Sequence, residues 1–163
     1  MSQAFLQRSI KRAANWESHK ESARQTTMRV MALDIGKVRC GIAISDPAMR
    51  VASPVCVLPT AEVVANAASF RRIIEDWEPE VLLSGLPLTL SGEQGPQARH
   101  IQEQARIIAE ALDLPLEFCD ERLSSTEAKR ALREQGMNEK AMRGKVDSVA
   151  ASIFLQAWLD ARQ

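Results

Sequence analysis

Four carboxylates occupy positions where a charged side chain requires a partner. Asp34 and the adjacent pair Asp120 and Glu121 directly follow apolar stretches, and Asp147 opens an apolar pattern of helical spacing. A charge at the edge of a core is expensive unless it is paired. If these acids converge, their mutual repulsion raises at least one pKa unless a divalent cation neutralises them. The residue types therefore predict a shared acidic site that binds metal.

Mg²⁺ or Mn²⁺ suits such a site, because hard cations prefer carboxylate oxygens and accept water and phosphate as further ligands. Ions held in this way can activate water and stabilise the leaving oxygen of a phosphodiester. The predicted catalytic residues and metal ligands are Asp34, Asp147 and the pair Asp120 and Glu121. Neighbours on a strand point to opposite sides, so the pattern does not choose within the pair. The alternative is that the four acids only form turns and cap helices.

Basic residues lie close to each acid and predict contacts with nucleic acid. Arginine can hold a phosphate with two hydrogen bonds, whereas lysine acts as a point charge. The predicted nucleic-acid-binding residues are Lys37, Arg39, Arg122, Arg143 and Lys145. The formal net charge is zero, so the chain lacks the overall basic character of many nucleic-acid binders. Phosphate binding must then depend on a local patch or on bound metal ions.

The elements that must position these residues follow from hydrophobic periodicity. Strands are expected within 28–33, 40–44, 51–58, 81–83 and 116–119, and helices within 67–77, 101–112, 124–135 and 146–157. The short link between the first two strands predicts an antiparallel hairpin, and Pro54 indicates an edge position for the third. Helical crossovers make the later strands parallel. The expected fold is α/β: a ribonuclease-H-like mixed five-stranded sheet, with a three-strand antiparallel meander, two parallel strands and flanking helices.

Two regions of different character divide the chain of 163 residues. Residues 1–27 are predicted to form a basic extension, with helical spacing of apolar residues, that either contacts nucleic acid or is poorly ordered. Residues 28–163 are expected to form one nuclease domain. No apolar run approaches the ~20 residues of a membrane span, and no secretory signal is evident. Three dispersed cysteines indicate reduced core residues, so a cytoplasmic location without membrane contact is expected.

Four segments together resemble the YqgF family, also called RuvX, of ribonuclease-H-like nucleases. They are LDIGKVRCGIAISD (33–46), GLPLTLSGEQGPQA (85–98), CDERLSSTEA (119–128) and KVDSVAASIFLQAWL (145–159). The resemblance implies a metal-dependent nuclease that processes the 5′ end of precursor 16S ribosomal RNA, with ribosomal precursor particles as possible partners. The family's acidic positions fall on Asp34, the Asp120–Glu121 pair and Asp147. Val38 departs from the lysine or arginine that is common in the family.

Three alternatives stay open at this point. Some family members are proposed to resolve Holliday junctions, so branched DNA is the alternative to structured RNA. A junction enzyme cuts two strands symmetrically and should dimerise, but no dimer face is evident, so the chain could be a monomer or a homodimer. Actin-like ATPases and sugar kinases share this sheet topology but need two such domains. A catalytically idle nucleic-acid-binding regulator is the third alternative, which the presence of all the expected acids disfavours.

Overall fold

The computed structural model describes residues 27–88, 95–122, 124–142 and 144–162. These residues form a mixed five-stranded sheet of order β3-β2-β1-β4-β5. The strands are β1 (Val30–Ile35), β2 (Arg39–Ser45), β3 (Ala52–Pro59), β4 (Val81–Leu86) and β5 (Leu116–Asp120). β1, β2 and β3 are an antiparallel meander, while β4 is parallel to β1 and β5 is parallel to β4. This arrangement confirms the predicted sheet.

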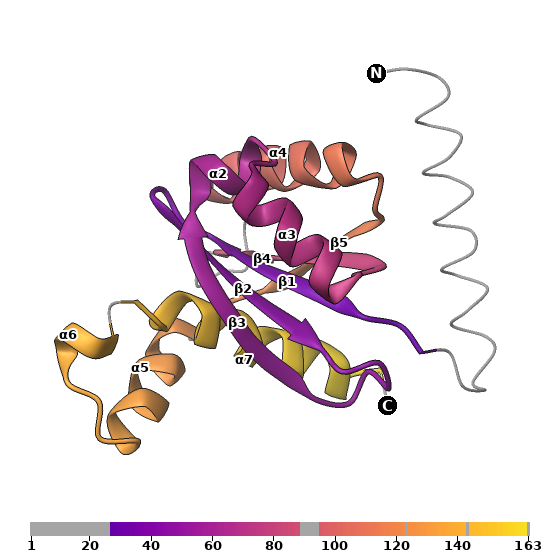
Figure 1. The fold of residues 1–163 in the computed structure, drawn as a ribbon. Helices are drawn as coiled ribbons and strands as arrows, with labels where there is room; N and C mark the ends of the chain where they lie inside the picture. The colour runs from indigo at the N-terminus through magenta and orange to yellow at the C-terminus, as the bar shows by residue number, and fades with distance from the viewer. Residues whose placement is uncertain (1–26, 89–94, 123, 143, 163) are drawn as a thin grey trace.

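Helices cover both faces of the sheet (Figure 1). Their bounds are α2 (Thr60–Val64), α3 (Ala68–Trp77), α4 (Pro96–Leu112), α5 (Ser124–Glu134), α6 (Glu139–Met142) and α7 (Val146–Asp160). In Figure 1, α2, α3 and α4 lie on one side of the sheet and α7 on the other. None of the helices in the described part of the chain is both long and apolar enough to cross a membrane.

The alternation of side chains along β1 fills two separate cores. Leu33 points into a cluster with Phe70 of α3 and Ile108 of α4. Ala32 points the other way, into a cluster with Phe154 of α7. Successive residues of a strand face opposite sides, so each residue of the sheet can be assigned to the α3–α4 face or to the α7 face. This assignment places the acids below.

The edge position predicted from Pro54 is confirmed, because β3 is the outer strand of the meander. Ile42 of β2 pairs with Cys56, and the next residue, Ala43, pairs with Pro54. One extra residue, Val55, therefore bulges from β3. Proline lacks the N–H that a central strand donates, and an edge strand with a bulge accommodates it.

Two short helices were not predicted from the sequence. α2 follows β3 directly, and α6 lies between the two helices predicted within 124–135 and 146–157. Both are too short to show a helical period in the sequence. The end predicted for α3 at residue 77 is confirmed: Glu78 closes this helix in the left-handed conformation, with its N–H donated to the carbonyl of Ile74. The predicted extension at residues 1–27 lies outside the described residues, apart from Thr27.

α5 and α6 project from the body of the molecule in Figure 1. They have a small core of their own, in which Leu132 and Met142 pack with Val146 and Ala150 of α7. The first turn of α7 is thus shared between this small core and the sheet.

Candidate active site

Asp34 follows the alternation of β1 onto the α7 face, two residues after Ala32. It lies near the end of its strand, where the core gives way to solvent. Burial raises the pKa of Asp34 from 3.8 to about 7, and repulsion from Asp147 acts in the same direction. The carboxylate therefore carries an uncompensated electrostatic cost at neutral pH.

Glu121 and Asp120 separate to opposite sides of the sheet. Phe118 of β5 packs in the α3–α4 core and Cys119 in the α7 core. Because alternate residues share a face, Glu121 lies on the α7 face with Asp34. Its N–H extends the ladder of β5 by donating to the carbonyl of Leu86 at 3.2 Å.

Gly85 of β4 makes the space that the Glu121 side chain occupies. A Cβ atom on Gly85 would overlap with Oε2 of Glu121 and would lie 2.9 Å from a ring carbon of Phe154. Gly85 opens the segment 85–98 that resembles the family, and the structure places this glycine inside β4, fully buried. Residues 89–94 of that segment lie outside the described residues.

One carboxylate oxygen of Glu121 lacks a hydrogen-bond partner. This atom, Oε2, is buried. Burial raises the pKa of Glu121 to about 7, and repulsion from Asp34 and then Asp120 adds to the shift. A buried acceptor without a donor costs about 1–3 kcal/mol. A cation supplies what this oxygen lacks.

Asp120, in contrast, is already neutralised at the surface. Its carboxylate accepts hydrogen bonds from the guanidinium Nε of Arg122 at 2.6 Å and from the Arg122 backbone N–H at 2.9 Å. The Arg122 side chain holds the pKa of Asp120 below its ordinary value. Asp120 and Arg122 thus form a local turn and ion pair, and their charges neutralise each other.

Asp147 reaches the site because Gly41 lets α7 approach the sheet. Gly41 is the β2 partner of Asp34. A Cβ on Gly41 would overlap with the backbone carbonyl of Asp147 and would lie 2.6 Å from the Ser148 nitrogen. Only glycine permits this contact. The acid also lies in the first turn of α7, where the helix dipole favours a negative charge.

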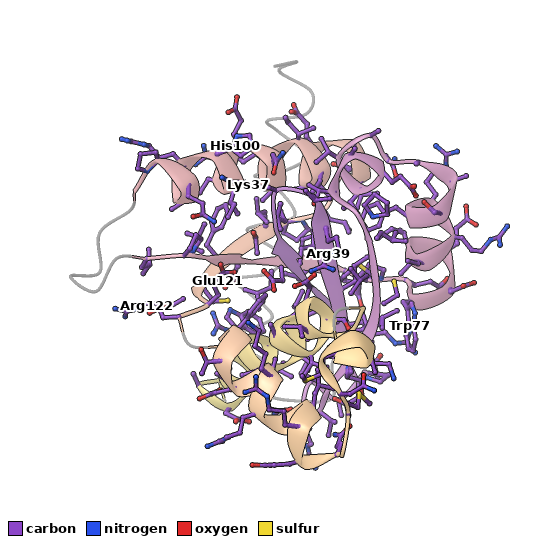
Figure 2. The ribbon with its side chains drawn as sticks, turned by 90° about the vertical axis from the view of Figure 1, so that its left-hand side faces the viewer. Lys37, Arg39, Trp77, His100, Glu121 and Arg122 are labelled. Atoms are coloured by element: carbon purple, nitrogen blue, oxygen red, sulfur yellow. The ribbon has the colours of Figure 1, made fainter. Side chains whose placement is uncertain are left out.

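Arg39 holds the Asp147 carboxylate, with Nε 3.1 Å from Oδ2. The Asp147 side chain is 23% exposed and that of Arg39 50%, so the pair lies at the mouth of the site. Figure 2 labels Arg39 at the start of β2 and Lys37 in the turn before it, on the hairpin that carries Asp34. Arginine beside a carboxylate cluster balances part of its charge before any cation binds.

The remaining basic residues predicted to bind nucleic acid are spread around the site. Lys37 is exposed in the β1–β2 turn, and Lys145 is exposed at the N-cap of α7. Arg122 is exposed and paired with Asp120. Arg143 lies outside the described residues. Lys37 and Arg39 are therefore the two that belong to the same hairpin as Asp34.

A divalent cation fits the three carboxylates on the α7 face, Asp34, Glu121 and Asp147, in donor type and in charge. All are hard oxygen donors, and two have a pKa raised to about 7. Within the described residues, however, no three His, Cys, Asp or Glu side chains stand close enough to enclose an ion. To be held by all three carboxylates, an ion would require these side chains to move closer together. The contact between Asp147 and Arg39 would then have to change.

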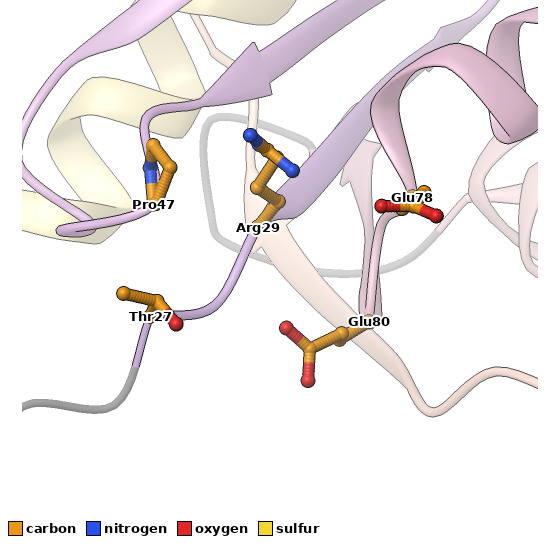
Figure 3. Close-up of a pocket in the computed structure, with 5 residues that line it drawn as sticks. All are labelled: Thr27, Arg29, Pro47, Glu78 and Glu80. Carbon is orange, nitrogen blue, oxygen red and sulfur yellow. The ribbon is translucent and has the colours of Figure 1, made fainter.

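A hollow of about 470 Å³ at the other end of β1 contains none of the predicted site residues. It is lined by Thr27, Arg29, Pro47, Glu78 and Glu80 (Figure 3). Arg29 lies just before β1, whereas Asp34 lies near the end of that strand. The hollow is thus separate from the acidic site.

Gly41 and Gly85 shape the acidic site, although neither was among the residues predicted to be catalytic, to bind metal or to bind nucleic acid. Each is a glycine inside a strand, which signals a bulge or a close backbone or side-chain approach. That signal was present in the sequence. The sequence did not show which group packs against each glycine, because α7 and Glu121 belong to distant parts of the chain.

Comparison with known proteins identifies the family. The model of the RuvX family, described as "Holliday junction resolvase", matches residues 28–161. A protein of Anaeromyxobacter sp. (strain Fw109-5), named "Putative pre-16S rRNA nuclease", is 41% identical over 135 residues, covering 83% of this chain and 98% of the relative. A protein of Chloroflexus aurantiacus with the same name is 40% identical over 134 residues, covering 82% and 88%.

Solved structures share the fold at low sequence identity. T. thermophilus RuvC in complex with Holliday junction substrate is 16% identical with a TM-score of 0.51, covering 83% of this chain and 95% of that one. The fowlpox virus resolvase in complex with its substrate Holliday junction DNA is 12% identical with a TM-score of 0.51, covering 82% and 98%. The family match and the two relatives decide the assignment: the chain belongs to the RuvX family of nucleases, which are hydrolases of phosphodiester bonds.

Proposed function

We propose that the chain is a metal-dependent nuclease in which Asp34, Glu121 and Asp147 hold Mg²⁺ or Mn²⁺. The observation that carries the proposal is the position of these three acids on the α7 face, where Arg39 balances Asp147 while burial and repulsion act on the other two carboxylates. The pKa of Asp34 and that of Glu121 are raised to about 7, and Oε2 of Glu121 is buried without a partner. An acidic site of this kind is stable in its charged form only when a cation is present.

Each residue has a separate task in this proposal. When bound, the metal would supply an activated water and stabilise the leaving oxygen of the phosphodiester. Asp34 and Glu121 would hold the cation from two strands of the sheet, and Asp147 from α7. Arg39, which balances Asp147 at 3.1 Å, would turn to a phosphate oxygen of the substrate once the cation takes over the carboxylate.

Asp120 and Arg122 have a supporting task in the proposal. Their ion pair closes the turn that follows β5 at the surface, whereas the Glu121 backbone is held by its own N–H bond to the Leu86 carbonyl. Lys37 and Lys145, and Arg143 beyond the described residues, would add phosphate contacts around the three acids. These contacts are local, in keeping with the net charge of zero.

The proposed substrate is the 5′ end of precursor 16S ribosomal RNA, and ribosomal precursor particles are the proposed partners. The names of the relatives at 41% and 40% identity support this choice. The description of the family model and the RuvC complex favour a second candidate, the DNA four-way junction. Both substrates would be cut by the same three carboxylates, so the site alone does not rank them.

Cleavage of two labelled substrates tests the proposal. Wild type, Asp34→Asn and Asp46→Asn are incubated with an RNA that carries the 5′ flank of precursor 16S RNA and with a DNA four-way junction, in Mn²⁺, in Mg²⁺ and in chelator. Asp46 is a partly exposed acid after β2 that accepts hydrogen bonds from the backbone of Arg50 and Val51, so it serves as the matched control.

Metal-dependent cutting by wild type and Asp46→Asn, with at least a ~100-fold loss in Asp34→Asn, is expected. Loss of an outer-shell partner of a metal alone costs about 10–100-fold, so loss of a direct ligand should cost more. The substrate that is cut faster decides between the two candidates. Cutting that continues in chelator, or that survives in Asp34→Asn, would refute the metal site.

A further inference from the structure

The tip of the β1–β2 hairpin is a braced turn beside the acidic site. The Gly36 N–H donates to the carbonyl of Arg39 at 2.9 Å and closes a two-residue loop, Lys37 and Val38. A Cβ on Gly36 would lie 2.7 Å from that carbonyl oxygen. Thr60, buried at the start of α2, donates through its hydroxyl to the Gly36 carbonyl at 2.8 Å and through its N–H to the Val38 carbonyl at 2.9 Å. The loop is therefore fixed from both sides.

Val38 is the most exposed of the large hydrophobic side chains in the described residues, at 77%. A single exposed valine is ordinary on a protein surface. This one stands between Lys37 and Arg39, on the hairpin that carries Asp34. Valine has few rotamers, and the backbone beneath it is already fixed, so a contact made by Val38 costs little ordering entropy.

We infer that the hairpin tip binds the nucleotide beside the bond that is cut, Lys37 through a phosphate and Val38 through the apolar face of an unstacked base. The inference rests on the proposed function and names the feature of the substrate that the site selects. In a continuous duplex, stacking covers the base faces, so apolar side chains reach them only where bases are unstacked. The tip thus favours a single-stranded or distorted nucleotide over a continuous duplex.

Binding in the Asp34→Asn background tests the inference, because this variant should bind without cutting. Fluorescence anisotropy of a labelled single-stranded RNA is followed over a range of salt concentrations, for the parent and with Val38→Ser, Val38→Lys or Val51→Ser added. Val51 is the matched control: it is 55% exposed and adjoins Ala52, at the far end of the β2–β3 pair from the hairpin tip.

Val38→Ser is expected to weaken RNA binding by about 3- to 10-fold, which is less than the loss for a fully buried valine because a base would cover only one side of this side chain. Because no charge changes, the salt dependence should stay the same. Val38→Lys adds a phosphate contact and should steepen the slope of log K against log salt by about 0.7. Val51→Ser should match the parent. A continuous duplex of the same sequence should lose less affinity in Val38→Ser than the single strand does.

The inference is overturned if Val38→Ser binds as the parent does and Val38→Lys leaves the salt slope unchanged, while the parent still binds RNA. That outcome leaves the proposed function standing. If wild type cuts neither substrate and the parent binds no nucleic acid, the proposed function fails and the inference fails with it. All variants replace exposed side chains, so unchanged melting temperatures confirm that the comparison is between folded proteins.

Discussion

Replacement of Asp34 by asparagine is predicted to stabilise the metal-free protein. The pKa of Asp34 is about 7 in the folded chain against an ordinary value of 3.8. Between these two values the folded state binds more protons than the unfolded state, so stability is fully present below about pH 4 and is lost as pH rises towards 7. A shift of about 3 units corresponds to at most ~4 kcal/mol, since each unit is worth about 1.4 kcal/mol. Asparagine carries no charge and avoids this loss.

Urea unfolding in chelator measures the effect, with the buried Trp158 of α7 as the fluorescent probe. Asp34→Asn should be more stable than wild type at pH 8, by up to ~4 kcal/mol, and the gain should shrink at pH 5. Glu121 and Asp34 repel each other, so part of the gain comes from relief of Glu121 and the two shifts do not add.

Asp46→Asn is the control of opposite sign. Hydrogen bonds from the backbone of Val51 and Arg50 hold the pKa of Asp46 below its ordinary value. The charged Asp46 side chain therefore contributes to the stability of the fold above its pKa in the unfolded state, and this contribution is lost on acidification. Asp46→Asn should accordingly lower the stability at pH 8. Addition of Mn²⁺ should then stabilise wild type but not Asp34→Asn, because a ligand at free concentration L that binds only the folded state adds RT ln(1 + L/Kd) to the free energy of unfolding. An Asp34→Asn variant no more stable than wild type at pH 8 in chelator would refute the reasoning.

Three further outcomes are expected. Gly41→Ala should lower the free energy of unfolding, measured in urea, by about 1–3 kcal/mol and abolish cleavage, because its Cβ would overlap with the start of α7. Gly95→Ala places its Cβ in open space and should keep cleavage. Equal activity of the two variants would contradict the packing account. Lys37→Gln should reduce the slope of log K against log salt by about 0.7 for single-stranded RNA, and an unchanged slope would remove Lys37 from the interface. Arg122→Gln should raise the pKa of Asp120, measured by NMR titration, while cleavage persists; an Asp120 pKa that does not move would show that the ion pair is not what lowers it.

The sheet and the candidate acids could be predicted from the sequence because a strand is recognised from residues that are neighbours in the chain. Alternation and apolar runs located all five strands, and Pro54 located the edge. Asp34 could be identified as a candidate because a carboxylate at the end of a buried strand is costly unless it binds a partner. These features depend on residues that are close neighbours in the chain.

The sequence could not show which of Asp120 and Glu121 lies on the same face as the other acids, and the reason is physical. Strand parity shows that the two acids face opposite sides, but which side holds Asp34 and Asp147 depends on where α7 packs. That position is fixed by the contact of Gly41 with the α7 backbone, more than 100 residues away in the sequence. Long-range packing of this kind leaves no periodic signal in the sequence.

The most direct test of the central claim compares Glu121→Gln with Asp120→Asn in the cleavage assay in Mg²⁺. The two acids are adjacent, yet only Glu121 faces Asp34, while Asp120 is paired with Arg122 at the surface. The account predicts that Glu121→Gln loses cleavage by at least ~100-fold and that Asp120→Asn stays within about threefold of wild type, as expected for an exposed ion pair. Loss of cleavage in Asp120→Asn with activity retained in Glu121→Gln would contradict it.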